Sequence, residues 1–128
     1  MRRMLGFAGM VVIMLLGGTA ALAGPWEDGM VAYNRGDYQP AIKLFKPLAQ
    51  AGNARAQNVM GVMYRKGEGV AKSSARAFMW FSLAARKGDT AAKANLQEMA
   101  KDMTPADLTQ AKEMMAACEA SDYRNCEY

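Results

Sequence analysis

The chain has 128 residues, of which 52% are hydrophobic, and it contains two cysteines and no histidine. This length suits one small domain, and the lack of histidine excludes a histidine general base or a histidine-activated triad. The formal net charge of +4 falls to +2 without Arg2 and Arg3, because 14 basic residues then remain against 12 acidic ones. Such a balance gives no reason to expect a nucleic-acid partner, which would favour a basic stripe.

The first 23 residues have the pattern of a secretory signal peptide. Arg2 and Arg3 precede an uncharged apolar run over 5–16, and Ala21-Leu22-Ala23 forms a small-x-small cleavage site. The alternative is a membrane anchor, since this stretch approaches the lower length limit of a spanning helix. The glycines and the cleavage site favour removal. We therefore expect cleavage after Ala23, a periplasmic or secreted domain over 24–128, and no membrane contact after cleavage.

The remainder of the chain predicts helices, and no segment alternates with a period of two. Pro25, followed by two acidic residues, begins a first helix that Gly36 ends. A second helix starts at Tyr38, and Pro47 is expected to kink or shorten its last turn. The apolar stripe of this second helix comprises Ala41, Ile42, Leu44, Phe45, Leu48 and Ala49.

Four further helices are predicted, each from a capping residue. The caps are Asn53, Ser73 or Ser74, Asp89 and Thr104. The last of these is the most complete start signal, because Pro105 takes the first helical position and Asp107 can close a capping box. Gly67 and Gly69 give the connection between the third and fourth helices its freedom, and Glu68 between them is expected to be a solvated loop acid. The chain therefore predicts an all-α fold of six helices in three antiparallel pairs.

A period of 36 residues relates successive pairs. Five positions recur at this interval: Ala41, Phe45, Ala49, Gly52 and Ala56 return as Ala77, Phe81, Ala85, Gly88 and Ala92. A fixed period of this length indicates a solenoid, in which stacking of the helix pairs supplies a core that no pair could form alone.

The central unit, 53–88, resembles a Sel-1-like repeat, a relative of the tetratricopeptide repeat. It reads Ala56-x3-Met60-Gly61-x-Met63-Tyr64-x2-Gly67-x-Gly69-Val70, then Ala77-x2-Trp80-Phe81-x2-Ala84-Ala85-x2-Gly88. The resemblance implies an α–α superhelix of about two and a half units. The flanking units are a degenerate one over 26–52 and a partial one over 89–128 with a closing helix. The partial unit has Gln97 where the period places Gly61.

Cys118 and Cys126 are the only cysteines of the chain. An even count in a short exported domain indicates a disulfide, and cysteine-rich relatives in this family place one at the end of a helix. A redox or metal-binding pair is the alternative, but there is no CxxC motif and no histidine. The methionines mostly lie on apolar stripes, as core residues do. We expect no metal and no cofactor.

The resemblance implies a non-catalytic adaptor or scaffold that binds a protein or peptide partner in the cell envelope. In such solenoids the first helix of each pair typically lines the concave side. The candidate partner-binding residues on that side are Arg55, Asn58, Val62, Arg65, Asn95 and Glu98.

Three other roles remain open. Some cysteine-rich relatives have been linked to cell-wall binding, so the protein could bind or modify peptidoglycan fragments, although the chain has no Ser-x-x-Lys element. A small helical domain could also stabilise a larger complex through its edges. An end face left by so few repeats could form a homodimer.

Overall fold

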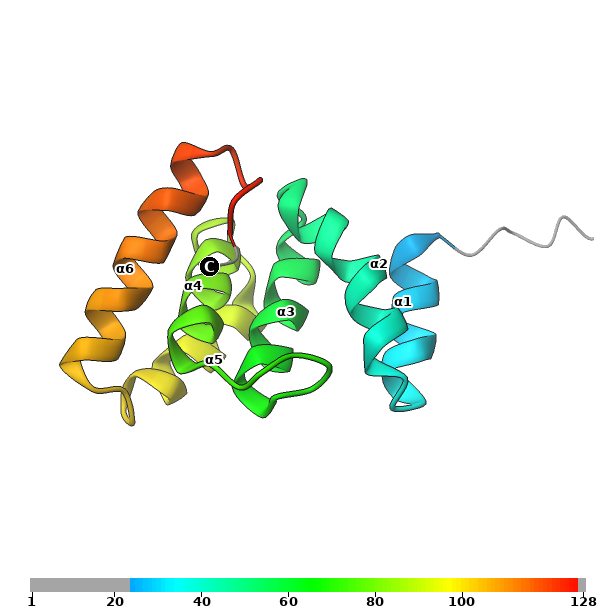
Figure 1. Ribbon diagram of the computed structural model, residues 1–128, viewed down its shortest axis with the longest axis horizontal. Helices are drawn as coiled ribbons and strands as arrows, with labels where there is room; N and C mark the ends of the chain where they lie inside the picture. The colour runs from blue at the N-terminus through cyan, green and yellow to red at the C-terminus, as the bar shows by residue number, and fades with distance from the viewer. Residues whose placement is uncertain (1–23, 127–128) are drawn as a thin grey trace, which may run out of the picture.

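The computed structural model describes residues 24–126, which form six α-helices and contain no β-strand (Figure 1). The helices are α1 (Pro25–Asn34), α2 (Tyr38–Gln50), α3 (Ala54–Lys66), α4 (Ser74–Arg86), α5 (Thr90–Ala100) and α6 (Pro105–Ala120). The all-α fold predicted from the sequence is confirmed. The predicted signal peptide lies outside the described residues. Within the described part, no helix combines the length and apolar character that a membrane span requires.

The helices begin at the predicted caps. The side chains of Asn53 and Asp89 each accept a hydrogen bond from the backbone amide three residues further on, at 3.0 and 2.8 Å. The first of the two candidate serines, Ser73, caps α4 in the same way. At α6, Thr104 Oγ1 accepts from the Asp107 amide at 3.1 Å, and Asp107 Oδ2 accepts from the Thr104 amide at 3.3 Å. This capping box satisfies two amides that the helix itself leaves without partners.

Pro47 does not shorten α2, which continues to Gln50. The carbonyl of Pro47 accepts a hydrogen bond from the Ala51 amide at 2.9 Å, so the helical bonding pattern resumes beyond the proline. The carbonyl that Pro47 leaves without its usual partner belongs to Lys43. Lys43 is exposed, and water can take the place of the missing donor there.

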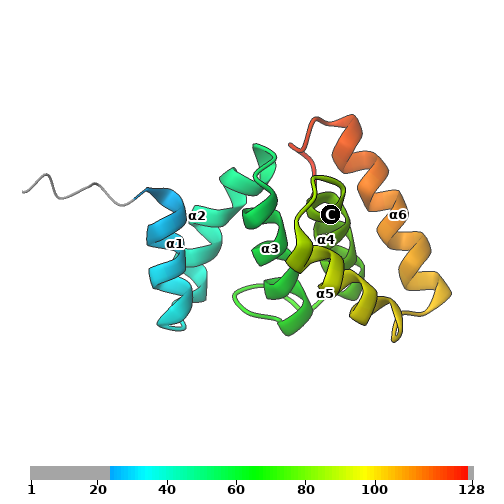
Figure 2. The ribbon, with the colours of Figure 1, turned by 180° about the vertical axis from the view of Figure 1, so that it is seen from behind.

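The helices form one array with α1 and α6 at opposite ends (Figures 1 and 2). Each helix from α1 to α4 packs against the next along the chain, whereas α6 packs mainly against α4. The centre of the core is α4, which carries the fully buried Trp80 and Phe81. Gln57 of α3 is the largest buried polar side chain, and its Nε2 donates to the Ala49 carbonyl of α2 at 3.1 Å.

A glycine facing a phenylalanine ring closes each of the first two helix pairs. A Cβ atom on Gly29 would lie 2.7 Å from Cε1 of Phe45, and one on Gly61 would lie 2.5 Å from Cδ1 of Phe81. The third pair has neither partner, because the exposed Gln97 occupies the place of Gly61 and α6 contains no aromatic residue. As a result α5 and α6 contact each other little, and both rest on α4.

The loop between α3 and α4 packs against the first helix pair. Glu68 is hydrogen-bonded to the side chains of Tyr33 and Tyr38, and its own side chain is only 13% exposed. Gln39 Nε2 donates to the Gly69 carbonyl at 2.8 Å and fastens the same loop. The expectation of a solvated Glu68 is therefore wrong. Its partners lie in a helix pair 30 or more residues earlier, which the local Gly-Glu-Gly pattern does not indicate.

Candidate functional site

The residues predicted to bind a partner lie on α3 and α5, and polar contacts bridge these two helices. Asn95 Nδ2 of α5 donates to Asn58 Oδ1 of α3 at 3.1 Å. Two turns further along α3 and one turn further along α5, Arg65 Nη2 donates to Glu98 Oε1 at 3.3 Å. The structure therefore brings four of the six candidates into two pairs, each joining α3, the first helix of the second helix pair, to α5, the first helix of the third.

Arg55 extends this line of contacts to α1. Its guanidinium carbon lies 4.2 Å from the centroid of the Trp26 ring, a cation–π distance. Trp26 in turn packs against Phe45 with ring centroids 5.3 Å apart, so its ring is held by the core. The structure gives Arg55 no carboxylate partner within residues 24–126. Sequence analysis missed Trp26. An aromatic residue in the first turn of the first helix was the available signal.

We refer to Trp26, Arg55, Asn58, Arg65, Asn95 and Glu98 together as the α1–α3–α5 strip. Val62, the remaining candidate, is half-buried on α3 and packs against the core, so only part of its side chain is open to a partner. Val31 of α1, by contrast, is 48% exposed.

The strip offers two kinds of recognition chemistry. The hydrogen bond between Asn58 and Asn95 uses one donor and one acceptor, and leaves the amide group of Asn58 and the carbonyl oxygen of Asn95 for other bonds. A peptide unit needs one acceptor and one donor in return. The guanidinium of Arg55, with its face on Trp26, keeps its N–H edge for a carboxylate. Arg65 and Glu98 neutralise each other and contribute little further charge.

The family comparison matches the central part of the chain. The Sel1 repeat family matches residues 54–89, which span α3, the loop with Glu68, and α4. The match covers one repeat and less than half of the chain. Sel1 repeats are helical modules that generally mediate protein–protein interactions, and Sel1-repeat proteins are generally non-catalytic adaptors. A search of curated proteins found no match to this chain.

The described residues hold no cluster that suggests a metal centre. No group of three or more His, Cys, Asp or Glu side chains in 24–126 could hold an ion. The titratable groups with clearly altered properties are Tyr33 and Tyr38. Burial, followed by the hydrogen bond to Glu68, raises the pKa of Tyr33 to about 12. The Glu68 hydrogen bond and burial raise the pKa of Tyr38. Both effects keep the phenols neutral, and neither residue lies on the strip.

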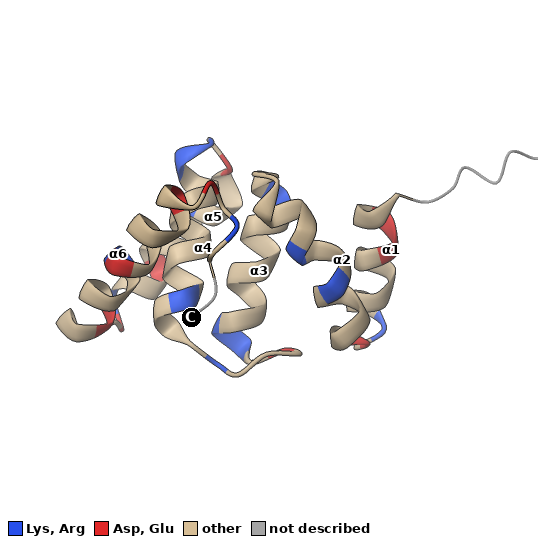
Figure 3. Cartoon of the chain, turned by 45° about the horizontal axis from the view of Figure 1, so that its top comes forward, with Lys and Arg blue, Asp and Glu red and all other residues tan. Residues whose placement is uncertain are grey.

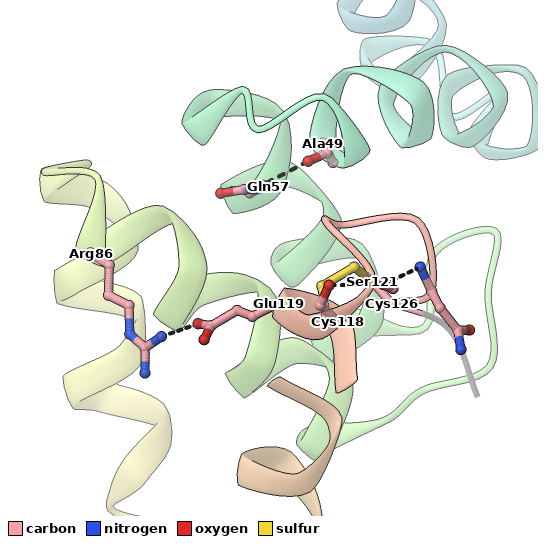
Figure 4. The surroundings of a disulfide bond; sticks show 8 residues. Ala49, Gln57, Arg86, Cys118, Glu119, Ser121 and Cys126 are labelled. Carbon is pink, nitrogen blue, oxygen red and sulfur yellow. Dashed lines mark hydrogen bonds and ion pairs between the residues drawn. A yellow bond between two sulfur atoms is a disulfide. The ribbon is translucent and has the colours of Figure 1, made fainter. Parts of the chain in front are cut away.

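A disulfide joins Cys118 at the end of α6 to Cys126 (Figure 4). Both cysteines are buried, and the loop between them includes Asp122 and Tyr123 at φ angles of 55° and 65°. Residues other than glycine disfavour that left-handed conformation, so the loop depends on the disulfide that closes it. The centroid of the Tyr123 ring lies 4.9 Å from Nζ of Lys87. The same Nζ donates a hydrogen bond to the Gly52 carbonyl in the turn between α2 and α3.

Proposed function

We propose that this protein is a non-catalytic Sel1-repeat adaptor that binds an extended peptide segment of a partner protein along the α1–α3–α5 strip. The observation that carries the proposal is the continuity of the strip: Trp26–Arg55, Asn58–Asn95 and Arg65–Glu98 connect three helices in a row. Such contacts hold the recognition groups in place before binding, which lowers the entropic cost of association.

Arg55 is the expected anchor for a carboxylate of the peptide. The stack on Trp26 fixes the plane of the guanidinium, and the absence of an acidic partner in the described residues leaves it available for a bidentate contact. Next to it, the open donor of Asn58 and the open acceptor of Asn95 match the carbonyl and amide of a peptide backbone. The ligand class we propose is therefore a peptide with an Asp, a Glu or a free C-terminus beside an extended backbone.

The place of action that we propose is the cell envelope. Residues 1–23 carry the features of a secretory signal peptide, and the Cys118–Cys126 disulfide is compatible with an oxidising compartment. The repeat unit over 53–88, with its partial neighbours over 26–52 and 89–128, would then be the exported domain. Partners would be met there after cleavage at Ala23.

The test is a cross-linking affinity capture from an envelope extract. The bait is the protein produced from its full-length sequence, beside the double variant Arg55→Ala/Asn58→Ala. Both side chains lie outside the buried core, so the variant should keep its helicity while losing the partner that the wild type recovers. The matched control, Lys43→Ala/Gln110→Ala, removes one cation and one amide at exposed positions away from the strip, and should recover the partner normally.

Equal recovery by the wild type and the strip variant would remove the strip from the proposal. Loss by both double variants would indicate a general defect rather than a site. Retention of all three proteins on insoluble peptidoglycan, without a protein partner, would favour the cell-wall role raised in the sequence analysis.

A further inference from the structure

An apolar groove of about 410 Å³ lies at the α6 end of the array. Its floor is α4 and its walls are α5 and α6. The residues that line it are Phe78, Ser82, Ala85 and Arg86 of α4, Leu96 of α5, and Lys112 and Met115 of α6. The groove shares no residue with the α1–α3–α5 strip, so a partner could occupy it whether or not a peptide binds the strip.

The groove exists because the third repeat unit is incomplete. Gln97 and the aromatic-free α6 leave α5 and α6 without the glycine–phenylalanine contact that closes the two earlier pairs. In a solenoid each unit contacts only its neighbours. A groove bounded by the last two helices is therefore the surface that the first helix of a following unit would cover.

The charges at the groove indicate what kind of helix fits. The charged residues that line it, Arg86 and Lys112, are both cationic. Arg86 is paired with Glu119 of α6, whereas Lys112 is exposed and has no acidic partner in 24–126. A complementary helix would bring an aliphatic side chain for the floor and acidic residues beside it for Lys112.

The outer face of α1 has this composition. Val31 is the large hydrophobic residue that is exposed in the described part of the chain, and Glu27 and Asp28 are exposed within one turn of it. Figure 3 shows the acidic residues of α1 in red. Arg35 follows a turn later, beyond the acidic pair. Since α1 is the first helix of the first unit and lies at the end of the array opposite to the groove, it occupies the position in its unit that the groove lacks.

We propose that two copies of this chain associate head to tail, with α1 of one copy seated in the α4–α5–α6 groove of the other. Val31 would enter the groove between Leu96 and Met115 on its two walls, and Glu27 and Asp28 would face Lys112. The two contacting surfaces differ, so the interface is heterologous and can extend beyond a dimer. A single exposed valine and a few charges predict a weak, concentration-dependent association rather than a permanent one.

The association is tested by sedimentation velocity on the protein produced from its full-length sequence, across micromolar to millimolar concentrations. The average mass of the wild type should rise with concentration. Val31→Asp and Lys112→Glu alter exposed side chains at the two opposite faces, and each should weaken association at least about tenfold, equivalent to 1.4 kcal/mol. Lys43→Glu makes the same charge change on the exposed surface of α2 and should behave as the wild type does.

Mixing the two variants distinguishes this geometry from a symmetric one. The Val31→Asp protein keeps an intact groove, and the Lys112→Glu protein keeps an intact α1, so the mixture should form a one-to-one dimer and nothing larger. Circular dichroism verifies that each variant is folded. A wild type that stays monomeric throughout the range, variants that assemble as the wild type does, or a mixture that stays monomeric would each overturn the proposal.

Discussion

The second and third helix pairs have similar length and the same order of elements, but they pack differently. In the second pair, Phe81 of α4 lies on Gly61 of α3, and the two helices pack closely along their length. In the third pair, α5 and α6 lean on α4 and leave a groove between them. The difference shows that the close approach of a pair depends on two positions, a glycine and the ring that faces it, rather than on helix formation.

The largest effect should come from filling the glycine position. Gly61→Leu places a side chain where even a Cβ would lie 2.5 Å from Phe81, so the pair must separate or the ring must leave its site. We expect the free energy of unfolding to fall by about 3 kcal/mol, the upper part of the range for overpacked cores. Chemical denaturation monitored by circular dichroism measures the change.

Gln97→Leu is the matched substitution in the third pair. Gln97 is exposed, so the same leucine should alter stability by no more than about 0.5 kcal/mol. Comparable losses from the two leucines would mean that the glycine contact does not explain the difference between the pairs.

The next effect concerns what replaces the missing contact in the third pair. The disulfide between Cys118 and Cys126 closes a short loop at the end of α6, and the Arg86–Glu119 ion pair links the same end to α4. Replacing both cysteines by alanine should cost about 2.5 kcal/mol by the chain-entropy relation for a loop of this length. Hydrogen exchange should show faster opening of α6 amides, with α3 amides less affected. An α6 as well protected as in the wild type would show that packing on α4 suffices.

The helices and their starts could be predicted from the sequence because the signals are local. Thr104, Pro105 and Asp107 specify the beginning of α6 within four residues, and the structure has the capping box there. The contacts that shape the surface are different in kind. Arg55 finds Trp26 across 29 residues, and a pattern of helical periods does not select that ring among other apolar residues. The six candidate residues follow from the family resemblance together with the helical period, and their role in binding stays a prediction.

Glu68 is a second long-range contact that local patterns do not indicate, and titration can test it. The loop of the second pair reaches Tyr33 and Tyr38 through Glu68, whereas the α5–α6 loop is short and ends in the capping box. The pKa of Tyr33 is raised to about 12 in the folded protein, so folding favours the neutral phenol. The stability that the neutral Tyr33 phenol contributes to folding is fully present below pH 10, the ordinary pKa of tyrosine. This contribution is lost as the pH rises from 10 through about 12.

Glu68→Gln removes the negative charge while preserving much of the shape. Spectrophotometric titration should then show a tyrosine ionising closer to its ordinary pKa than in the wild type, although burial would keep part of the shift because it is the larger cause. Lys66→Gln, which removes the cation paired with Glu68 at 3.6 Å, should leave the tyrosines neutral over the same range. An unchanged titration after Glu68→Gln would assign the shift to burial alone.

The smallest effect is expected at the contact between the two pairs. Arg65 and Glu98 form an ion pair at 3.3 Å, with side chains 33% and 68% exposed, so water and salt screen most of their attraction. A double-mutant cycle with Arg65→Ala and Glu98→Ala should give a coupling energy between about 0.2 and 1 kcal/mol that shrinks as salt is added. The Arg65–Glu98 ion pair aligns α3 with α5. The free energy of peptide binding to the strip should therefore fall by more in these variants than the free energy of unfolding does. A large coupling energy that is insensitive to salt would instead mean that α3 and α5 are held together as firmly as α3 and α4 are.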